Sequence, residues 1–493
     1  MKSIFLYIRR LLLLMVLTLT TLGLQAQSNL SLYPLDDEFN AFDYNPAFLS
    51  SPEKFTFSIF PLAGMNVTMN NQAILREAAR KSSSGIISET YYEDLFNRLL
   101  DKSSFHENVD VTFLNFTYKN KKGFFNFRVK DRQFLDASIN GEVTNFIFKS
   151  DIRSAAIGKV QHFPVQASHY REYSLGYAYT SPDKRFSAGM RAKLYYGKFA
   201  FYSYIDGSVD SQGGDFGLHT KGKVYVSFPG KTIKSTDANT YAVDLSNAKI
   251  KDYLFNSGNS GAGVDIGLVY KPNPSLTFSM SVIDLGRISW KKNLNSRIMD
   301  KEFPLAATSY GLDTISGVPT ITKKERYAYS NSFDFFDLQE DTSSFHTTLP
   351  ATIYAGLKYL VNPGLSVSVT DRYVAMKNLG YNSFSLAANM ELNKKLTTSI
   401  GYSIIGDSYF NIPFALLLKR SFGQMYLGTD NLLFVVFPSK ADYASVSFGA
   451  CFYLFTHRNL LLKRDKNLPF YQPRKTIKNR TSGLIIKARN KDK

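Results

Sequence analysis

Few residues in this sequence have the types and spacing that catalysis requires. Residues 258–262 lack the last glycine of the nucleophile elbow of serine hydrolases. Residues 217–223 are spaced like a phosphate-binding loop, but Val224 stands where that loop needs serine or threonine. We predict no catalytic residue, no metal site and no cofactor, and we expect that the protein is not an enzyme. The histidines show no paired metal-ligand spacing; they are His106, His162, His169, His219, His346 and His457.

Asp265 and Asp284 lie in strand-like segments that are apolar on one face. Asp265 falls on the polar face, where a solvated or hydrogen-bonded carboxylate needs no special explanation. Asp284 instead continues the phase of the apolar residues before it. A carboxylate that faces lipid is disfavoured, so either a β-bulge shifts the register here or Asp284 already lies among lipid headgroups.

Arg287 is close enough in sequence to pair with Asp284. Trp290 then fits an anchor at the outer membrane interface. We interpret residues 284–286 as structural rather than as a substrate site.

The strands that hold these residues are clearest in residues 349–455. In residues 396–404, Leu396, Ile400 and Ile404 fall on one face, whereas Ser399 and Ser403 fall on the other. This alternation predicts antiparallel strands with one apolar and one polar face. Such a meander is either a soluble sheet with its core on the apolar side or a membrane barrel with a polar lumen.

The lengths of the connections distinguish these alternatives. With residues 54–62 as the first strand and residues 223–228 assigned to a loop, tight turns follow even-numbered strands and long connections follow odd-numbered ones. Outer-membrane barrels separate turns and loops in this way. We predict an all-β fold, a transmembrane antiparallel β-barrel of about 14 strands. Short helices are expected in the outer loops, at residues 72–80, 89–100 and 142–147.

Composition supports export to a membrane. The 493 residues include 40 Phe and 31 Tyr, which suits aromatic girdles, and no internal apolar run is long enough for a helical span. Basic residues precede an apolar run at residues 11–24, and Ala26 is followed by polar sequence. This predicts a signal peptide, residues 1–26, cleaved before Gln27; an N-terminal membrane anchor is the alternative. Cys451 is the only cysteine, so no internal disulfide forms.

The net charge of +18 lies largely in the signal peptide and in the tail, residues 456–493. An exported chain is not expected to bind nucleic acid. The tail should lie in the periplasm, either as a solvated extension or as a binding site for anionic lipid or an envelope protein. The predicted organisation is a hatch at residues 27–53, a barrel at residues 54–455 and this basic tail.

Several motifs resemble a family of uncharacterised outer-membrane barrels from Bacteroidetes-type bacteria, a domain of unknown function. That family is distantly similar to the long-chain fatty-acid transporters and to the secretion-system barrel PorV. The motifs lie at residues 45–48, 172–177, 263–267, 283–290 and 424–431, and include Asp430 and Asn431 as candidate lumen or rim residues together with Asp265, Asp284 and Arg287.

The resemblance implies roles for the two ends of the barrel. In the fatty-acid transporters an Asn-Pro-Ala motif belongs to a hatch that plugs the lumen; an ordinary turn is the alternative here. The last strand resembles the signal that the barrel-assembly machinery binds, although this chain continues beyond it. The candidate hatch residues are Asn45, Pro46, Ala47 and Phe48.

Two functions remain open at this point. The first is a transport barrel whose hatch-plugged lumen passes or binds a small molecule, a hydrophobic one if the resemblance extends to its cargo. The second is a scaffold or adaptor barrel of an envelope or secretion complex. A transporter predicts a continuous apolar pocket behind the hatch, and a scaffold predicts a filled lumen. Lipid of the outer membrane is the expected environment of both.

Overall fold

The computed structural model describes most of the chain from Leu30 to Leu454. All structural statements below refer to these stretches: residues 30–48, 54–70, 104–120, 123–138, 161–212, 215–229, 231–234, 241–244, 253–305, 310–315, 318–323, 339–375, 380–438 and 441–454.

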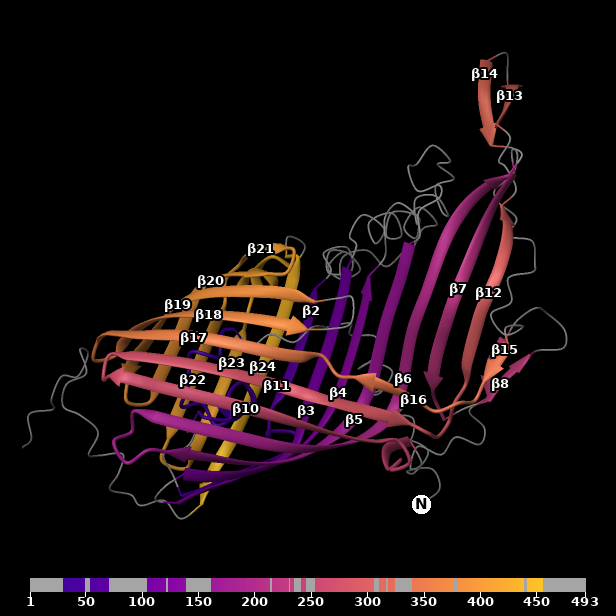
Figure 1. Ribbon diagram of the computed structural model, residues 1–493. Helices are drawn as coiled ribbons and strands as arrows, with labels where there is room; N and C mark the ends of the chain where they lie inside the picture. The colour runs from indigo at the N-terminus through magenta and orange to yellow at the C-terminus, as the bar shows by residue number, and fades with distance from the viewer. Residues whose placement is uncertain are drawn as a thin grey trace, which may run out of the picture.

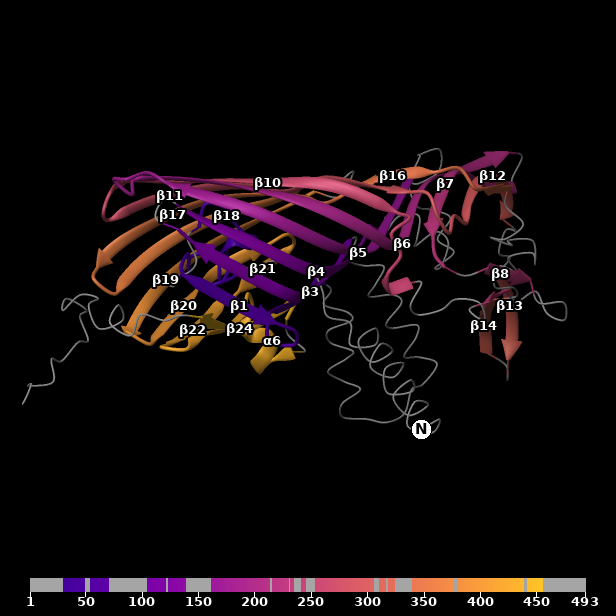
Figure 2. The ribbon, with the colours of Figure 1, turned by 90° about the horizontal axis from the view of Figure 1, so that it is seen from below.

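The wall is a closed 14-strand antiparallel β-barrel (Figure 1). The first strand is interrupted and has two segments. The barrel closes because the last strand pairs with both of these segments (Figure 2). The wall strands, in order, are β1 (Phe55–Ile59) with β2 (Met65–Asn70), β3 (Ser104–Lys119), β4 (Gly123–Ser138), β5 (Gln161–Thr180), β6 (Phe186–Gln212), β10 (Ser260–Asn273), β11 (Leu276–Trp290), β16 (Phe345–Thr348) with β17 (Ala351–Asn362), β18 (Leu365–Ala375), β19 (Tyr381–Asn393), β20 (Leu396–Ile405), β21 (Ser408–Asn411) with β22 (Phe414–Arg420), β23 (Gly423–Thr429) and β24 (Tyr443–Leu454).

The two faces of the wall are as the alternation predicts. In β20, Ser399 and Ser403 are buried towards the interior, whereas Ile400 and Tyr402 are exposed on the outside. The exposed apolar residues form a belt around the barrel, which is the surface that lipid covers in a membrane barrel. Members of this belt include Leu175, Met190, Leu194, Ile266, Leu268, Phe278, Met280, Leu357, Leu386, Met425, Leu427, Phe448 and Phe452.

The predicted separation of turns and loops holds with one exception: only residues 406–407 join β20 to β21, at the loop end. Short connections join β3 to β4, β5 to β6, β10 to β11, β17 to β18, β19 to β20 and β22 to β23, all at one end of the barrel. No helix among the described residues is long and apolar enough to cross a membrane.

Some predicted strand boundaries are wrong. The first strand continues to Asn70, but it is interrupted by the Phe60–Pro61 bond, which is cis, and by Gly64, whose φ is +132°. The predicted strand at residues 424–437 ends at Thr429. A short helix, α6 (Leu432–Val436), follows, and the Asn431 side chain caps it by accepting a hydrogen bond from the Leu433 amide at 3.1 Å.

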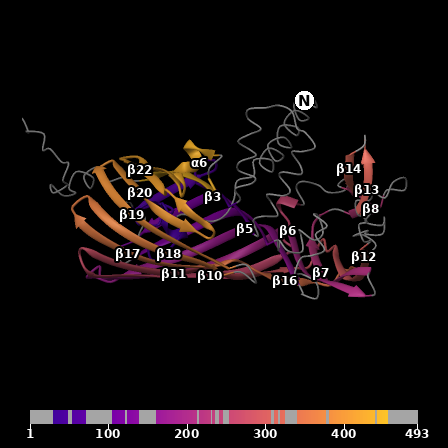
Figure 3. The same ribbon diagram turned by 90° about the horizontal axis from the view of Figure 1, so that it is seen from above.

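The wall continues beyond the barrel on one side. β7 (Asp215–Ser227) pairs with the outer half of β6 and with β12 (Ser296–Leu305), which also pairs with β15 (Gln339–Asp341). These strands run past the loop end of the barrel (Figures 1 and 3). Residues 223–227 are therefore part of a strand rather than of a loop. The 14-strand wall is unaffected, because β7 pairs with residues 200–212 of β6, whereas the wall strand β10 pairs with residues 186–196.

Other expected features lie outside the described residues. These are the signal peptide, the helices at residues 72–80, 89–100 and 142–147, and the tail after residue 455. Two separate hairpins are described in the outer loops: β8 (Lys231–Lys234) with β9 (Tyr241–Asp244), and β13 (Tyr310–Ile315) with β14 (Val318–Lys323).

The belt yields a stability test. Leu268 lies five residues from the end of β10 at Asn273, about half of the strand length that crosses a bilayer. We expect Leu268→Arg to lower the free energy of unfolding by about 2–4 kcal/mol, because the charge would face the bilayer midplane. Val361→Arg is the control, since Val361 is exposed beside a short turn and should cost about 0–1 kcal/mol. Urea titration in lipid vesicles measures both, and equal losses would contradict the placement of the belt.

Candidate functional site

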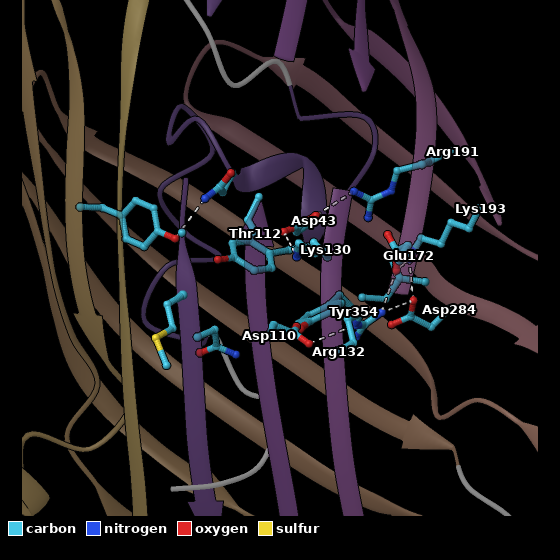
Figure 4. Close-up of a pocket in the computed structure, with 17 residues that line it drawn as sticks. Asp43, Asp110, Thr112, Lys130, Arg132, Glu172, Arg191, Lys193, Asp284 and Tyr354 are labelled. Atoms are coloured by element: carbon cyan, nitrogen blue, oxygen red, sulfur yellow. Dashed lines mark hydrogen bonds and ion pairs between the residues drawn. The ribbon is translucent and has the colours of Figure 1, made fainter. Parts of the chain in front are cut away.

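Residues 30–48, which we call the inner segment, fill the interior of the barrel. Nearly all of them are buried, and one turn is a 3-10 helix, η1 (Ala41–Asp43). Polar contacts join the segment to strands on opposite sides of the wall. Asp43 accepts a hydrogen bond from Arg191 of β6 at 2.7 Å, whereas Asp37 pairs with Lys419 of β22 (Figure 4 shows the Asp43 side). Asp36 bonds to Lys358 of β17 at 2.8 Å.

Glycines in the wall make room for this segment. A Cβ added at Gly189 would lie 2.0 Å from the Pro46 carbonyl oxygen, and one at Gly267 would lie 2.0 Å from the Asn45 side-chain oxygen. No real Cβ atom approaches another atom so closely, so a larger residue at either position would displace the inner segment. Three further wall glycines meet it in the same way: Gly176 against Phe42, Gly356 against Tyr33 and Gly428 against Leu32.

The Asn-Pro-Ala-Phe motif is bound to the wall through its first side chain. The Asn45 amide donates hydrogen bonds to the carbonyl oxygens of Leu268 at 3.3 Å and Met280 at 3.2 Å. Its oxygen accepts from the Ala47 amide at 2.8 Å, which holds the turn through Pro46. Phe48 packs edge-on against Tyr33.

Asp43 is the most highly connected acid of the inner segment. Its carboxylate pairs with Arg128 and Lys130 of β4 and with Arg191 of β6. Burial alone would raise the pKa of Asp43, but these three cations hold it well below its usual range. The carboxylate is therefore charged at any pH at which the protein is expected to work.

A chain of buried ion pairs continues from Arg191 along the wall. Arg191 and Lys193 both bind Asp265, at 2.6 and 2.9 Å. Lys193 also binds Asp284 at 2.5 Å, and Arg132 binds Asp284 at 2.7 Å. Arg132 reaches two further acids, Asp110 at 3.0 Å and Glu172 at 3.2 Å. Asp265 and Asp284 are thus brought together inside the barrel.

Of the two alternatives for Asp284, the structure shows the β-bulge. The β10–β11 register shifts between Val264 and Ile266, and Asp284 has φ +63°, the left-handed conformation. Its amide donates to the Asp265 carboxylate at 2.7 Å. The bulge turns Asp284 inward, so the alternative location among lipid headgroups is wrong.

The bulge also inverts the faces of the residues that follow it. Arg287 is exposed on the outside and does not pair with Asp284, contrary to expectation. Trp290 is fully buried and donates a hydrogen bond to the Thr347 hydroxyl at 2.8 Å, so its expected role as an interface anchor is wrong. It packs beside Phe345 and against Gly197.

Asp430 and Asn431 are both buried at the loop end of β23. The Asp430 carboxylate accepts from the Ser31 amide at 2.8 Å, so it binds the start of the inner segment. The Asn431 amide donates to the Tyr443 carbonyl oxygen at 2.9 Å and caps α6, a structural role.

The wall cations were missed from the sequence. Arg128, Lys130 and Arg132 lie at every second position of β4 on its inner face, directly after Phe125 and Phe127, which point outward. Three cations at every second position, in phase with Asn126 and out of phase with the outward Phe125 and Phe127, are the signal that could have placed them in the lumen.

Two of the cavities that border the inner segment are lined by charged residues. One, of about 50 Å³, lies beside Asp43 and is lined also by Lys130, Arg191 and Asp110. The other, of about 320 Å³, lies at the short-turn end between Leu35, Phe48, Lys358 and Glu391. Both have mixed or polar linings. The described residues contain no cluster of three or more His, Cys, Asp or Glu side chains that could hold a metal ion.

Residues 46–430 match the model of a family of unknown function, DUF5723. The protein belongs to this family. The predicted membership in a family of uncharacterised barrels is therefore confirmed. With its closed wall and apolar belt, this DUF5723 protein is an outer-membrane β-barrel. The Bacteroidetes origin and the likeness to PorV stay predictions.

Solved structures similar to this DUF5723 protein include transporters. The toluene transporter TodX of P. putida is 10% identical, with a TM-score of 0.38 over 85% of this chain and 95% of its own. The Ralstonia pickettii toluene transporter TbuX is 11% identical, with a TM-score of 0.36 over 85% and 93%. A Pseudomonas aeruginosa FadL homologue is 8% identical, with a TM-score of 0.36 over 87% and 98%. No curated protein matches the chain.

The wall glycines give a test of how the inner segment is held. We expect Gly189→Val to raise protease cleavage within residues 30–48 several-fold, because its side chain would collide with Pro46. Ala188→Val is the matched control, since it lies next along β6 but on the opposite face. Limited proteolysis of both folded variants measures the difference. Equal cleavage would show that the glycine is not needed for docking.

A second test concerns Glu38, which is fully buried in the inner segment. One carboxylate oxygen accepts from the Asn40 amide at 2.6 Å, and the other has no partner among the described residues. Burial raises the pKa of Glu38 from 4.5 to about 8. At Glu38 the released segment therefore binds fewer protons than the docked one, so the contribution of Glu38 to docking is full below about pH 4.5 and is lost as pH rises through about 8.

Hydrogen exchange of residues 30–48, corrected for intrinsic rates, should show this loss of protection between pH 5.5 and 8.5. Glu38→Gln should remove the pH dependence, whereas Asp37→Asn should retain it. A dependence that survives Glu38→Gln would assign it to another group.

Proposed function

We propose that this protein passes a small molecule across the outer membrane and that the inner segment closes the route. One observation carries the proposal: the interior is filled by a separate piece of chain rather than by side chains of the wall. A barrel of about 8 strands can be filled by its own side chains, so a wider wall encloses space that it cannot fill. Displacing the inner segment would free that space.

The contacts of the segment suit a movable closure. Much of its attachment is polar, through Asp36, Asp37, Asp43 and Asn45, and such groups can exchange protein partners for water when they leave. The side chains of a purely apolar plug could not form hydrogen bonds with water in this way when the plug left its site. The mixed lining of the larger cavity, between Leu35 and Lys358, favours an amphipathic solute over a wholly apolar one.

The scaffold alternative also has support. The described lumen is filled, and β7 and β12 carry the sheet beyond the barrel, where it offers a surface to other envelope proteins. A binding partner for the basic tail would belong to this alternative. In a scaffold, the inner segment would never need to move.

A reversible tether separates the two functions. Asp36→Cys and Lys358→Cys, in a Cys451→Ala background, can be joined by a flexible disulfide-containing bismaleimide, because their native side chains meet at 2.8 Å. We expect the linked barrel to block a panel of neutral, anionic and apolar small solutes in a proteoliposome flux assay. Cleaving the linker with a reductant should raise the flux at least several-fold.

The control is the pair Tyr359→Cys and Val367→Cys, which face each other on β17 and β18. Both lie on the outer face, so linking them joins two wall strands without touching the inner segment. Flux that is the same before and after reduction in the first pair, or absent for every solute, would overturn transport in favour of the scaffold.

A further inference from the structure

The three cations that bind Asp43 depend on it for their charge balance. Among the described residues, Asp43 is the only acid paired with Arg128 or Lys130. Arg191 has one other acid, Asp265. The cations project from two strands, β4 and β6, towards one point in the lumen (Figure 4 labels Lys130 and Arg191).

The strand between β4 and β6 carries only small inward residues at this point. β5 lies between β4 and β6, and its inward residues here are Ser174 and Gly176. Gly176 lies opposite Arg191, and Ser174 lies opposite Arg128. Phe42 of the inner segment fills the space above Gly176, and the neighbouring Asp43 carboxylate reaches the flanking cations.

Two polar groups at this position lack partners. Arg128 is fully buried, and its Nε has no hydrogen-bond acceptor in the described part of the protein. The Ser174 hydroxyl is likewise buried and unpaired there. Buried donors are normally satisfied, so unpaired ones beside a carboxylate indicate capacity for an anion with more oxygen atoms than Asp43 offers.

Departure of the inner segment would leave this site positive. The network has equal numbers of cations and acids. The five cations are Arg128, Lys130, Arg132, Arg191 and Lys193, and Asp43 is one of the five acids, so its departure leaves one cation in excess. The other four acids bind Arg132, Lys193 and Arg191. Arg128 and Lys130 would then have no acid in the described wall. Guanidinium forks and an ammonium group together suit the oxygens of a carboxylate or phosphate.

We propose that Arg128, Lys130 and Arg191 form a binding site for a carboxylate or phosphate group of the solute, and that Asp43 occupies this site as a tethered competitor. The anion that takes the place of Asp43 removes one attachment of the inner segment and so favours opening. The cavity of about 50 Å³ beside Asp43 gives such a group access to Lys130 and Arg191. This inference rests on the proposed function for the identity of its ligand.

Asp43→Asn tests the site directly, with inorganic phosphate as the probe. Titration calorimetry of the purified barrel should detect phosphate binding to Asp43→Asn at least tenfold tighter than to the unaltered protein. Adding Lys130→Gln to that variant should abolish the gain. Asp43→Glu keeps the competing charge, so it should bind phosphate no more tightly than the unaltered protein does. This comparison does not depend on the folding yield of Asp43→Asn.

Asp36→Asn is the matched control, since it removes an acid of the same segment that pairs with Lys358 on the far side. It should loosen the segment without the gain in phosphate affinity. An equal gain in Asp36→Asn, or none in Asp43→Asn, would overturn the site. Heat-modifiable gel migration verifies that each variant is folded.

Flux separates the failure of this site from the failure of transport. In proteoliposomes, Asp43→Asn should pass a small carboxylate at least threefold faster than a neutral solute of equal size, and Lys130→Gln should remove that preference. Flux without an anion preference would overturn the site and leave transport intact. Phosphate binding without any flux would leave the site intact and overturn transport.

Discussion

The carboxylate of Asp43 is the contact on which the organisation of the interior depends. It is shared by Arg128, Lys130 and Arg191, and through Arg191 it joins the ion pairs that run along the wall to Asp284. Breaking a buried pair by removing one partner is strongly destabilising because the other charge is left uncompensated. The wall and the inner segment therefore specify each other: the wall carries cations that need an acid from outside it.

Ion pairs of this kind give position rather than raw stability. Burying charges has a large desolvation cost, which the attraction between them only offsets when the geometry is good. Apolar packing supplies the rest: Leu32, Phe39 and Tyr44 of the inner segment share a cluster with Tyr354 and Tyr426 of the wall. The segment is thus held like a ligand, by apolar contact over its body and by charged groups at fixed points. The wall glycines complete that fit, because they let the backbone at Pro46 touch the sheet.

The wall could be predicted from the sequence, and most of the interior could not. Lipid requires apolar residues on the outer face at every second position, and this requirement is visible in β20 and β24 without any knowledge of tertiary contacts. Interior partners follow no local rule. Arg132 and Asp284 meet although 152 residues separate them, because strand stagger and closure of the barrel bring β4 and β11 to the same height. The unfavourable carboxylate of Asp284 narrows the choice to a bulge or a position among headgroups, but it does not predict the effect of the bulge on Arg287 and Trp290.

The two sides of the wall differ greatly in height. β6 has 27 residues, a length of about 90 Å at the usual rise, whereas the wall strand made of β21 and β22 runs only from Ser408 to Arg420. A bilayer core is about 30 Å thick, so the tall side stands far above the lipid while the low side ends close to it. The mouth of the barrel is therefore oblique. A molecule that diffuses within the outer leaflet would meet the opening at the low side, beside β22 and α6, whereas a large particle in the medium would first touch the sheet of β6, β7 and β12.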